Sequence, residues 1–373
     1  MASSNEPSFA HTSKNPGRDH CRPSVDGRSA RGLSLSRAAL HAIGALLLLF
    51  AVGCAKGEVS SGQGAIGGTV SGAGGTMQIT LGTSPASDAA APTQALVCDS
   101  GDACACPLIN VAVLGKPGKW GPVKGADTDT ALQDWLNGNS AGSARVDNFT
   151  ERKTLTSDFL ATYNVIILQS LSEDSDVGPW WSYGADEAAA FQSWIEGGGG
   201  VISLIGYSSG DEISPVNQLL QFSGVTYNND GVWGECADSQ VCTCTGSNTL
   251  SDWVRTDPVI AKVSTGVTFV GFQNGRSINA PSDGHVAATI DGKPVLVGKL
   301  AGKGRVLAFG DEWITYTSQW TGAGNPKATD PSCQGNLPQD KYQMAQFWYN
   351  MIRWAQPNSD CFTIVDSSPV TIW

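Results

Sequence analysis

Two periodicities of apolar residues alternate along the central part of the chain and predict alternating strands and helices. Segments in which apolar residues predominate, typical of buried strands, occur at 109–114, 163–168, 199–205 and 304–309. Apolar residues at helical spacing are found at 128–138, 185–195, 214–222 and 341–355. This alternation implies a mostly parallel sheet with helices on both of its faces.

Three further segments are predicted as strands outside these runs. Residues 144–146 form a short strand, and 267–272 is strand-like. Residues 285–300 predict a β-hairpin that turns at Asp291-Gly292-Lys293. The predicted fold class is therefore α/β, with a mostly parallel sheet, a β-hairpin and loop insertions.

The first 54 residues have the pattern of an export signal and do not belong to the fold. Residues 1–37 are polar, and residues 38–50 form an apolar stretch. The stretch ends in Ala51-Val52-Gly53-Cys54, which resembles a bacterial lipobox and implies a lipid anchor at Cys54. The alternatives are an ordinary secretory signal or a single membrane span, although a span needs about 20 apolar residues. Ala55 in place of Asp implies, by resemblance to enterobacterial sorting, an exported protein held in the outer membrane.

The rest of the chain divides into a tether, one domain and a tail. Residues 55–96 are rich in Gly, Ser, Ala and Thr and predict a flexible tether. Residues 97–356 suit one α/β domain with a loop insertion at 224–250, followed by a tail at 357–373. After residue 53 there are 17 basic and 31 acidic residues, a net charge of −14. We expect no nucleic-acid partner, because an acidic surface repels it.

Eight cysteines remain once Cys21 and Cys54 are set aside, and an even number in an exported protein predicts disulfides. Two triplets share the spacing Cys-x5-Cys-x-Cys, and two single residues follow: Cys98, Cys104, Cys106, Cys236, Cys242, Cys244, Cys333 and Cys361. Metal binding is the alternative, but paired Cys-x2-Cys knuckles are absent and we predict no metal. Sequence leaves the pairing of eight cysteines open.

The segment Gly206-Tyr207-Ser208-Ser209-Gly210 is the strongest chemical signal. It lies between the predicted strand at 199–205 and the predicted helix at 214–222. A serine on a tight strand-to-helix turn, with glycines for the close approach, is typical of a nucleophile elbow. The same Gly/Ser-rich turn is also common in α/β folds without catalysis.

Four segments resemble, in their order and spacing, the class I glutamine amidotransferase-like fold and especially its ThuA-like branch. They are YNVIIL at 163–168, WIEGGGGV at 194–201, GKGRVLAFG at 302–310 and FWYNMIRW at 347–354. The resemblance covers roughly 108–356. It implies a flavodoxin-like fold, with ligands at the carboxyl ends of the parallel strands, as is general for open α/β sheets.

The catalytic pattern of the resembled family is incomplete here. Its elbow is Gly-x-Cys-x-Gly, and a later strand ends in Phe-His-Pro-Glu. This chain has Ser208 at the cysteine position, Gly310 at the histidine position and Glu312 at the glutamate position. A serine needs a base within reach, and His285, the one histidine after Cys54, falls at the start of the predicted hairpin. We therefore expect no glutamine amidotransferase activity.

Other fold relatives place a serine at the elbow, in a pattern that resembles Gly-x-Ser-Ala-Gly. This keeps a serine hydrolase open, with Ser208 as nucleophile, His285 as base and Glu312 as the group that orients it.

Carboxylates and tryptophans favour a binding edge. Asp211-Glu212 and Asp311-Glu312 both follow predicted strands, so they serve either as acid/base groups or as helix caps and turn residues. Trp180, Trp181, Trp233, Trp313 and Trp320 fall in predicted loops or near strand ends, where they either cover the core or line a sugar-binding rim.

The leading hypothesis is a cell-envelope lipoprotein whose degenerate, non-catalytic domain binds a small polar ligand such as a saccharide or cell-wall fragment. The predicted ligand-binding residues are Tyr207, Ser208, Asp211, Asp311, Glu312 and Trp313. The alternatives are the serine hydrolase, acting on a peptide or ester, and a scaffold protein of an envelope complex. We predict no cofactor.

Overall fold

The computed structural model describes residues 70–72, 75–77, 108–116, 130–174, 178–206, 210–356, 362–364 and 370. Residues 70–72 and 75–77 form two short antiparallel strands, β1 (Val70–Gly72) and β2 (Gly75–Met77). The predicted export signal, including Cys54, lies outside the described residues. No helix among the described residues has the length and apolarity that a membrane crossing requires.

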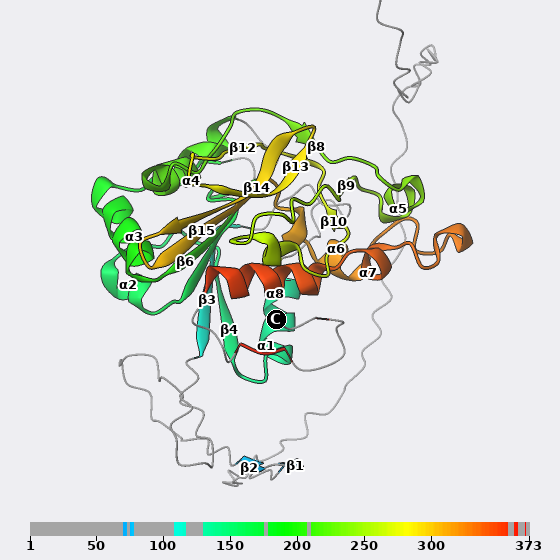
Figure 1. Ribbon diagram of the computed structural model, residues 1–373, viewed down its shortest axis with the longest axis horizontal. Coiled ribbons are helices and arrows are strands. Elements are labelled where there is room, and N and C mark those ends of the chain that lie inside the picture. Colours follow the sequence, from blue (N-terminus) through cyan, green and yellow to red (C-terminus); the bar gives the residue numbers. More distant parts are fainter. Residues whose placement is uncertain are drawn as a thin grey trace, which may run out of the picture. The chain divides into compact units, whose positions relative to one another are not determined.

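A seven-stranded sheet forms the centre of the domain (Figure 1). Its strands are β3 (Ile109–Leu114), β4 (Ala144–Phe149), β5 (Val165–Leu168), β6 (Gly200–Leu204), β13 (His285–Ile290), β14 (Lys293–Ala301) and β15 (Gly304–Phe309). The spatial order is β13-β14-β15-β6-β5-β3-β4. The five strands β3, β4, β5, β6 and β15 are parallel, and their order is 2-1-3-4-5 in chain sequence. This is the flavodoxin-like order, and it confirms the predicted fold class.

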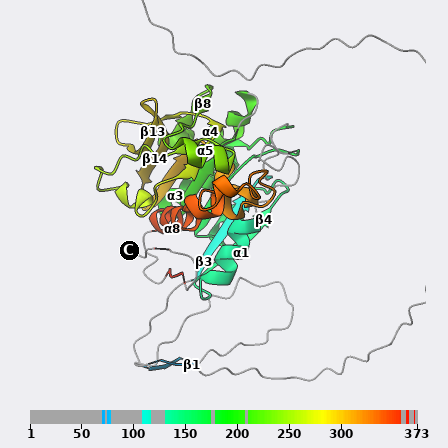
Figure 2. The same ribbon diagram turned by 90° about the vertical axis from the view of Figure 1, so that its right-hand side faces the viewer.

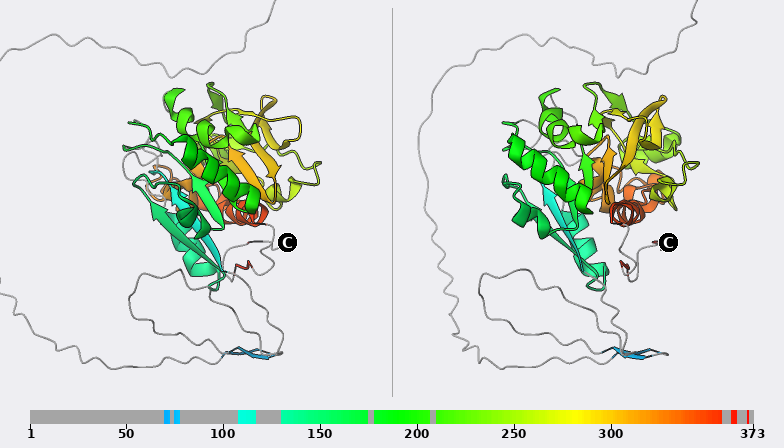
Figure 3. Two further views of the ribbon diagram at one scale, coloured as in Figure 1. Left: turned by 90° about the vertical axis from the view of Figure 1, so that its left-hand side faces the viewer. Right: turned by 60° about the vertical axis from the view of Figure 1, so that its left-hand side comes forward.

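Helices cover both faces of the sheet (Figure 3). One face packs α1 (Thr130–Asn139) and α8 (Met344–Ala355), and the other packs α2 (Ser157–Ala161), α3 (Ala185–Gly197) and α4 (Ile213–Leu220). Within β5, Val165 and Ile167 belong to the first hydrophobic core, whereas Ile166 and Leu168 belong to the second. Because successive side chains of a strand point to opposite faces, a strand covered on both faces must be apolar throughout. That is why Val165–Leu168 form a continuous apolar run in the sequence.

The predicted hairpin is present as β13 and β14, joined at Asp291 and Gly292. Both residues have positive φ, 50° and 73°, as a type I′ turn requires. The hairpin extends the parallel sheet with two antiparallel strands.

The loop insertion extends from α4 to β13. It contains three short antiparallel pairs and one helix: β7 (Thr226–Tyr227) with β12 (Ile278–Asn279), β8 (Val232–Trp233) with β11 (Asn274–Gly275), β9 (Thr249–Leu250) with β10 (Val270–Gly271), and α5 (Ser239–Thr245). Only β10 falls in the strand expected at 267–272. Strands of two residues are too short to leave an alternating pattern in the sequence.

Two disulfides hold this insertion, which confirms the prediction for four cysteines. Cys236 pairs with Cys242, and Cys244 pairs with Cys333. The second bond ties α5 to the segment after β15, which contains α6 (Thr317–Thr321) and α7 (Pro338–Lys341). Figure 2 shows α5 lying beside this orange segment. Cys98, Cys104, Cys106 and Cys361 lie outside the described residues.

Part of the C-terminal tail packs into the domain. Phe362 is 3% exposed and stacks on Tyr349 of α8, with ring centroids 5.1 Å apart. The backbone N–H of Thr363 donates to the hydroxyl of Ser143, just before β4. The domain therefore includes residues beyond 356.

Side chains protect the outer edge of β4. Asn137 and Gln133 of α1 bond the backbone N–H and C=O of Val146, at 2.9 Å and 3.2 Å. An open strand edge otherwise invites pairing with another chain. At the opposite edge of the sheet, backbone groups cover the strand instead: the N–H of Val254 donates to the carbonyl oxygen of Ala287, and the N–H of Thr289 donates to that of Asp252.

Candidate functional site

The predicted binding region lies where β6 and β15 end side by side, at the carboxyl edge of the sheet. Leu204 of β6 is in register with Phe309 of β15, so the chain leaves the sheet at neighbouring points, through Gly206 and Gly310. Tyr207 and Ser208 lie outside the described residues. Residues Gly210–Glu212 form a 3-10 turn that leads directly into α4. A strand and a helix thus flank the segment, as an elbow requires.

Two buried glutamates lie on either side of Gly206. Glu212 is 1% exposed, and its Oε1 accepts the backbone N–H of Gly206 at 2.9 Å. Glu312, which follows β15, is 2% exposed, and a Cβ at position 206 would lie only 2.3 Å from its Cδ. The hydroxyl of Tyr316 donates to Oε1 of Glu312. Residue 206 must be glycine because the carboxyl group of Glu312 occupies the space of a side chain.

Asp311 holds the insertion to the end of β15. It is fully buried, with Oδ2 accepting the N–H of Gln273 at 2.5 Å and Oδ1 accepting that of Trp313 at 3.0 Å. Burial raises the pKa of the Asp311 carboxyl to about 7, against the effect of these N–H donors, which lower it. The structure thus places Asp311 as a turn residue that satisfies backbone donors, the second of the two roles considered for it.

The other two predicted binding residues differ in exposure. Asp211, in the turn before α4, is exposed. Trp313 is 8% exposed and packs against Tyr316, with ring centroids 5.9 Å apart. Of the four described residues predicted to bind ligand, Asp211 alone faces solvent.

Tyr227 of the insertion joins the ends of β6 and β15. Its hydroxyl lies 2.9 Å from the carbonyl oxygen of Ser203 and 3.1 Å from that of Phe309. Burial raises the pKa of this phenol well above its ordinary value of 10, so it remains protonated and neutral. The base of the site is therefore built partly from the insertion.

His285 lies at the start of β13, across the sheet from Gly206. It is in register with Gly298, which pairs with Leu307, which pairs with Ile202 of β6. Three strand spacings separate β13 from β6, roughly 14 Å at about 4.8 Å each. Its Nδ1 lies 2.8 Å from Oδ2 of Asp257, so the structure brings His285 together with Asp257. The relay between Ser208 and His285 stays a prediction.

Arg276 was not singled out by sequence reasoning, yet it lies beside the elbow. The ribbon formed by β8 and β11 sits on the end of β15: a Cβ at Gly275 would lie 1.8 Å from the carbonyl oxygen of Gly310. The next residue, Arg276, is 7% exposed, and its Nη1 donates to Oδ1 of Asn229 at 3.3 Å. The Asn229 amide in turn lies against Gly210, where a Cβ would be 2.6 Å from its Nδ2. A lone arginine in a loop carries no sequence signal of such a position.

The tryptophans divide between core and surface. Trp348 and Trp354 of α8 are 0% and 2% exposed, as expected for core residues. Of those predicted in loops, Trp181 and Trp313 are also buried, whereas Trp233 of the β8–β11 ribbon is 54% exposed. Trp233 is therefore the best candidate among the described residues for an aromatic surface that binds ligand.

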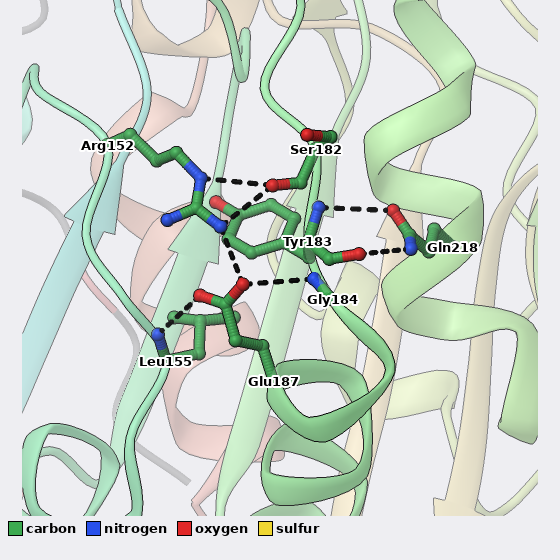
Figure 4. A network of polar contacts seen from close by, with 7 residues as sticks. All are labelled: Arg152, Leu155, Ser182, Tyr183, Gly184, Glu187 and Gln218. Carbon is green, nitrogen blue, oxygen red and sulfur yellow. Dashed lines mark hydrogen bonds and ion pairs between the residues drawn. The ribbon is translucent and has the colours of Figure 1, made fainter.

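A second polar network positions α4, the helix that follows the elbow (Figure 4). Tyr183 donates its backbone N–H to Oε1 of Gln218 in α4 and accepts from Nε2 of the same amide. Next to it, Arg152 bonds the carbonyl oxygen of Ser182 and pairs with Glu187 of α3 at 2.6 Å. These contacts link the loops after β4 and β5 to α3 and α4.

This edge of the sheet thus combines buried carboxyl groups that accept from protein donors, one buried guanidinium and one exposed indole. No group of three or more His, Cys, Asp or Glu side chains in the described part of the chain has the arrangement of a metal site.

Comparisons with known proteins give the chain no family. No protein-family profile matches it, and no curated protein matches it in sequence. A cytoplasmic protein from Salmonella typhimurium LT2 is 15% identical over 66% of this chain and 100% of its own, with a TM-score of 0.44. A ThuA-like protein from Bacteroides uniformis ATCC 8492 is 14% identical over 73% of this chain and 95% of its own, with a TM-score of 0.37. The fold class therefore rests on the strand order of the chain itself.

The raised pKa of Asp311 predicts a pH-dependent stability. The folded protein keeps a proton between about pH 4 and 7 that an unfolded aspartate, with a pKa of about 3.9, has lost. The free energy of unfolding due to this group should thus decrease as pH rises through that window, by up to about 1.4 kcal/mol per pH unit, and level off above it. Urea denaturation of the wild type and of Asp311→Asn at several pH values measures this pH dependence, because the variant lacks the carboxyl group that titrates. A difference between the two proteins that is constant from pH 4 to 8 contradicts the prediction.

The contact between Gly206 and Glu312 predicts opposite effects for two glycine substitutions. Gly206→Ala should destabilise the protein by about 1–3 kcal/mol, because its Cβ collides with a buried carboxyl group. Gly138→Ala, in α1, adds the same atoms where nothing lies within 4 Å and should stabilise by up to about 1 kcal/mol. Chemical denaturation of both variants measures the effects. A Gly206→Ala protein as stable as the wild type would show that Glu312 does not occupy this position.

Proposed function

We propose that this chain binds a small polar ligand, in particular a saccharide or cell-wall fragment, at the carboxyl edge of its sheet without turning it over. The observation that carries the proposal is that the carboxyl groups after β15 are engaged in bonds and contacts within the protein. Asp311 bonds two backbone N–H groups, Glu312 holds Tyr316 and lies against Gly206, and Gly310 stands where the resembled enzymes have a histidine.

The absence of a histidine near the elbow supports a binding role. A base must reach the nucleophile directly or through one water. His285 is the one histidine after Cys54, and it pairs with Asp257 three strands away from β6.

The surface around the elbow supports a saccharide. Trp233 offers an exposed, flat apolar face on the β8–β11 ribbon. Asn229 and Asp211 are exposed polar residues, and the Asn229 amide lies against Gly210, which precedes Asp211. Sugar rings stack on indoles while their hydroxyls bond amides and carboxylates. The proposed binding edge thus joins Trp233 and Asn229 to the residues predicted from sequence.

A serine hydrolase is the second candidate, and one observation favours it. Glu212 and Glu312 both lie within contact of Gly206, two residues before Ser208. A buried carboxylate at that place is a base that does not depend on His285.

The test combines reactivity with binding on the full chain. We expect a fluorophosphonate probe to leave the intact mass of the protein unchanged. Ligand-detected NMR with a panel of neutral and acidic saccharides and short peptides should show binding of saccharides. Trp233→Ala should weaken that binding about tenfold. A single adduct that Ser208→Ala removes would replace the proposal with the hydrolase. A folded protein that neither reacts nor binds would favour the scaffold role.

We propose further that the chain is a lipoprotein of the cell envelope, exported and anchored through Cys54. The support is the sequence pattern at 38–54 alone. Expression in a bacterium with labelled palmitate should give a labelled, membrane-associated protein, and Cys54→Ser should lose the label because the thiol is the acceptor. Cys21→Ser serves as the control and should keep it. Equal labelling of wild type and Cys54→Ser, or none in either, refutes the anchor.

A further inference from the structure

We infer that the saccharide bound at this edge is an amino sugar with a free amine, whose ring stacks on Trp233 and whose ammonium group pairs with Glu235. The inference rests on the proposed saccharide binding and names the class of sugar. It is carried by the placement of an exposed indole and an exposed carboxylate on one face of the same extended segment.

Residues 232–235 alternate between the inside and the outside of the domain. Val232 is 4% exposed in the first hydrophobic core, and a Cβ at Gly234 would lie 2.1 Å from the carbonyl oxygen of Phe272. Trp233, by contrast, is 54% exposed, and Glu235 is exposed as well. Because successive residues of an extended segment point to opposite sides, Trp233 and Glu235 share the face that is directed to solvent.

Backbone pairing fixes the position of this face. Trp233 pairs with Asn274 in the β8–β11 ribbon, and Glu235 exchanges both of its backbone hydrogen bonds with Thr249 of β9. Positions two apart on a strand are separated by about 6.6–6.8 Å. That separation suits one hexopyranose ring lying on the indole, with a substituent of the ring directed to the carboxylate.

The carboxylate of Glu235 is available to a ligand. Within the part of the chain that the structure describes, no hydrogen bond or ion pair engages it, and Glu235 makes its polar contacts there through its backbone. The other two carboxylates of residues 224–250 are engaged. That of Asp230 pairs with Lys293 at 2.9 Å, and that of Asp238 accepts from the first N–H groups of α5.

The local charge favours a cation at Glu235. Residues 224–250 contain three acidic residues and no basic residue. Arg276 comes beyond Gly275, which pairs with Val232, so the register of the ribbon places this arginine at the end away from Glu235. A positively charged ligand therefore meets a negative potential beside Trp233.

An ammonium group gains two attractions at this place that a hydroxyl group does not. One is the ion pair with the Glu235 carboxylate, and the other is the attraction of a cation to the face of the Trp233 ring. Both are modest between exposed groups, and salt screens them. The inference therefore predicts a preference of limited size that depends on ionic strength.

The test compares three tetrasaccharides that differ at one ring position. Chitosan tetramer, cellotetraose and chitin tetramer carry an ammonium, a hydroxyl and an acetamido group there. The full chain is titrated with each by calorimetry at about pH 6, where the amine is protonated. We expect chitosan tetramer to bind about three- to tenfold more tightly than the two uncharged sugars at about 0.15 M salt. The preference should disappear at about 1 M salt, where the Debye length is about 3 Å.

Variants separate Glu235 from a general attraction of the cation to an acidic surface. Glu235→Gln should abolish the preference, Glu235→Asp should retain part of it, and Trp233→Ala should weaken the binding of all three sugars. Glu196→Gln is the matched control, because it removes an exposed carboxylate at the end of α3, next to the start of β6 and thus at the opposite edge of the sheet. This variant should keep the preference of the wild type.

The outcomes distinguish the class of sugar from saccharide binding itself. Equal affinity of the wild type for chitosan tetramer and cellotetraose overturns the amino-sugar class and leaves saccharide binding intact. A preference that Glu196→Gln lowers as much as Glu235→Gln does also overturns it. A folded wild type that binds none of the three sugars refutes the proposed function as well. The first comparison uses the wild type alone, so it holds even if a variant fails to fold.

Discussion

The carboxyl edge of this domain depends on one constraint: buried carboxyl groups must find hydrogen-bond donors. Asp311 and Glu312 are 0% and 2% exposed at the end of β15, where an unsatisfied polar group is costly. Asp311 takes donors from Gln273 and Trp313, and Glu312 takes one from Tyr316. Gln273 belongs to the insertion, so satisfying Asp311 also fixes the β8–β11 ribbon on the sheet. The surface that carries Trp233 and Glu235 has its position for this reason.

Glycine at the strand ends makes this close packing possible. Three glycines here pack so closely against neighbouring groups that a Cβ atom would not fit: Gly206, Gly275 and Gly310. The carboxyl group of Glu312 fills the space at Gly206, and the backbone of Arg276 fills the space at Gly310. Residues of a nucleophile elbow would also have glycine at such points. Glycines at such points thus serve a catalytic turn in one protein and the close packing of strand ends in another, and the pattern alone does not distinguish the two.

The buried groups and the exposed groups of the edge have different roles. Asp311, Glu312 and Trp313 form the base, whereas Asp211, Asn229 and Trp233 are open to solvent. Arg276 lies between the two sets, buried yet next to the rim. The proposed binding role needs only a few convergent polar groups on a rigid base, and it does not need the proton transfer that turnover of a peptide or ester demands.

The amino-acid sequence by itself determined the α/β class, the parallel strands, the hairpin and the tryptophans of α8. Each of these depends on periodicity or on turn chemistry, which are local and therefore visible along the chain. Tertiary structure alone decided the pairing Cys244–Cys333, the contact of Gly206 with Glu312, and the position of Arg276. These join residues far apart in sequence, from segments too short to leave a periodic pattern. The burial of Asp311 and Trp313 and the exposure of Trp233 were decided in the same way, because burial depends on what the insertion covers once the chain has folded.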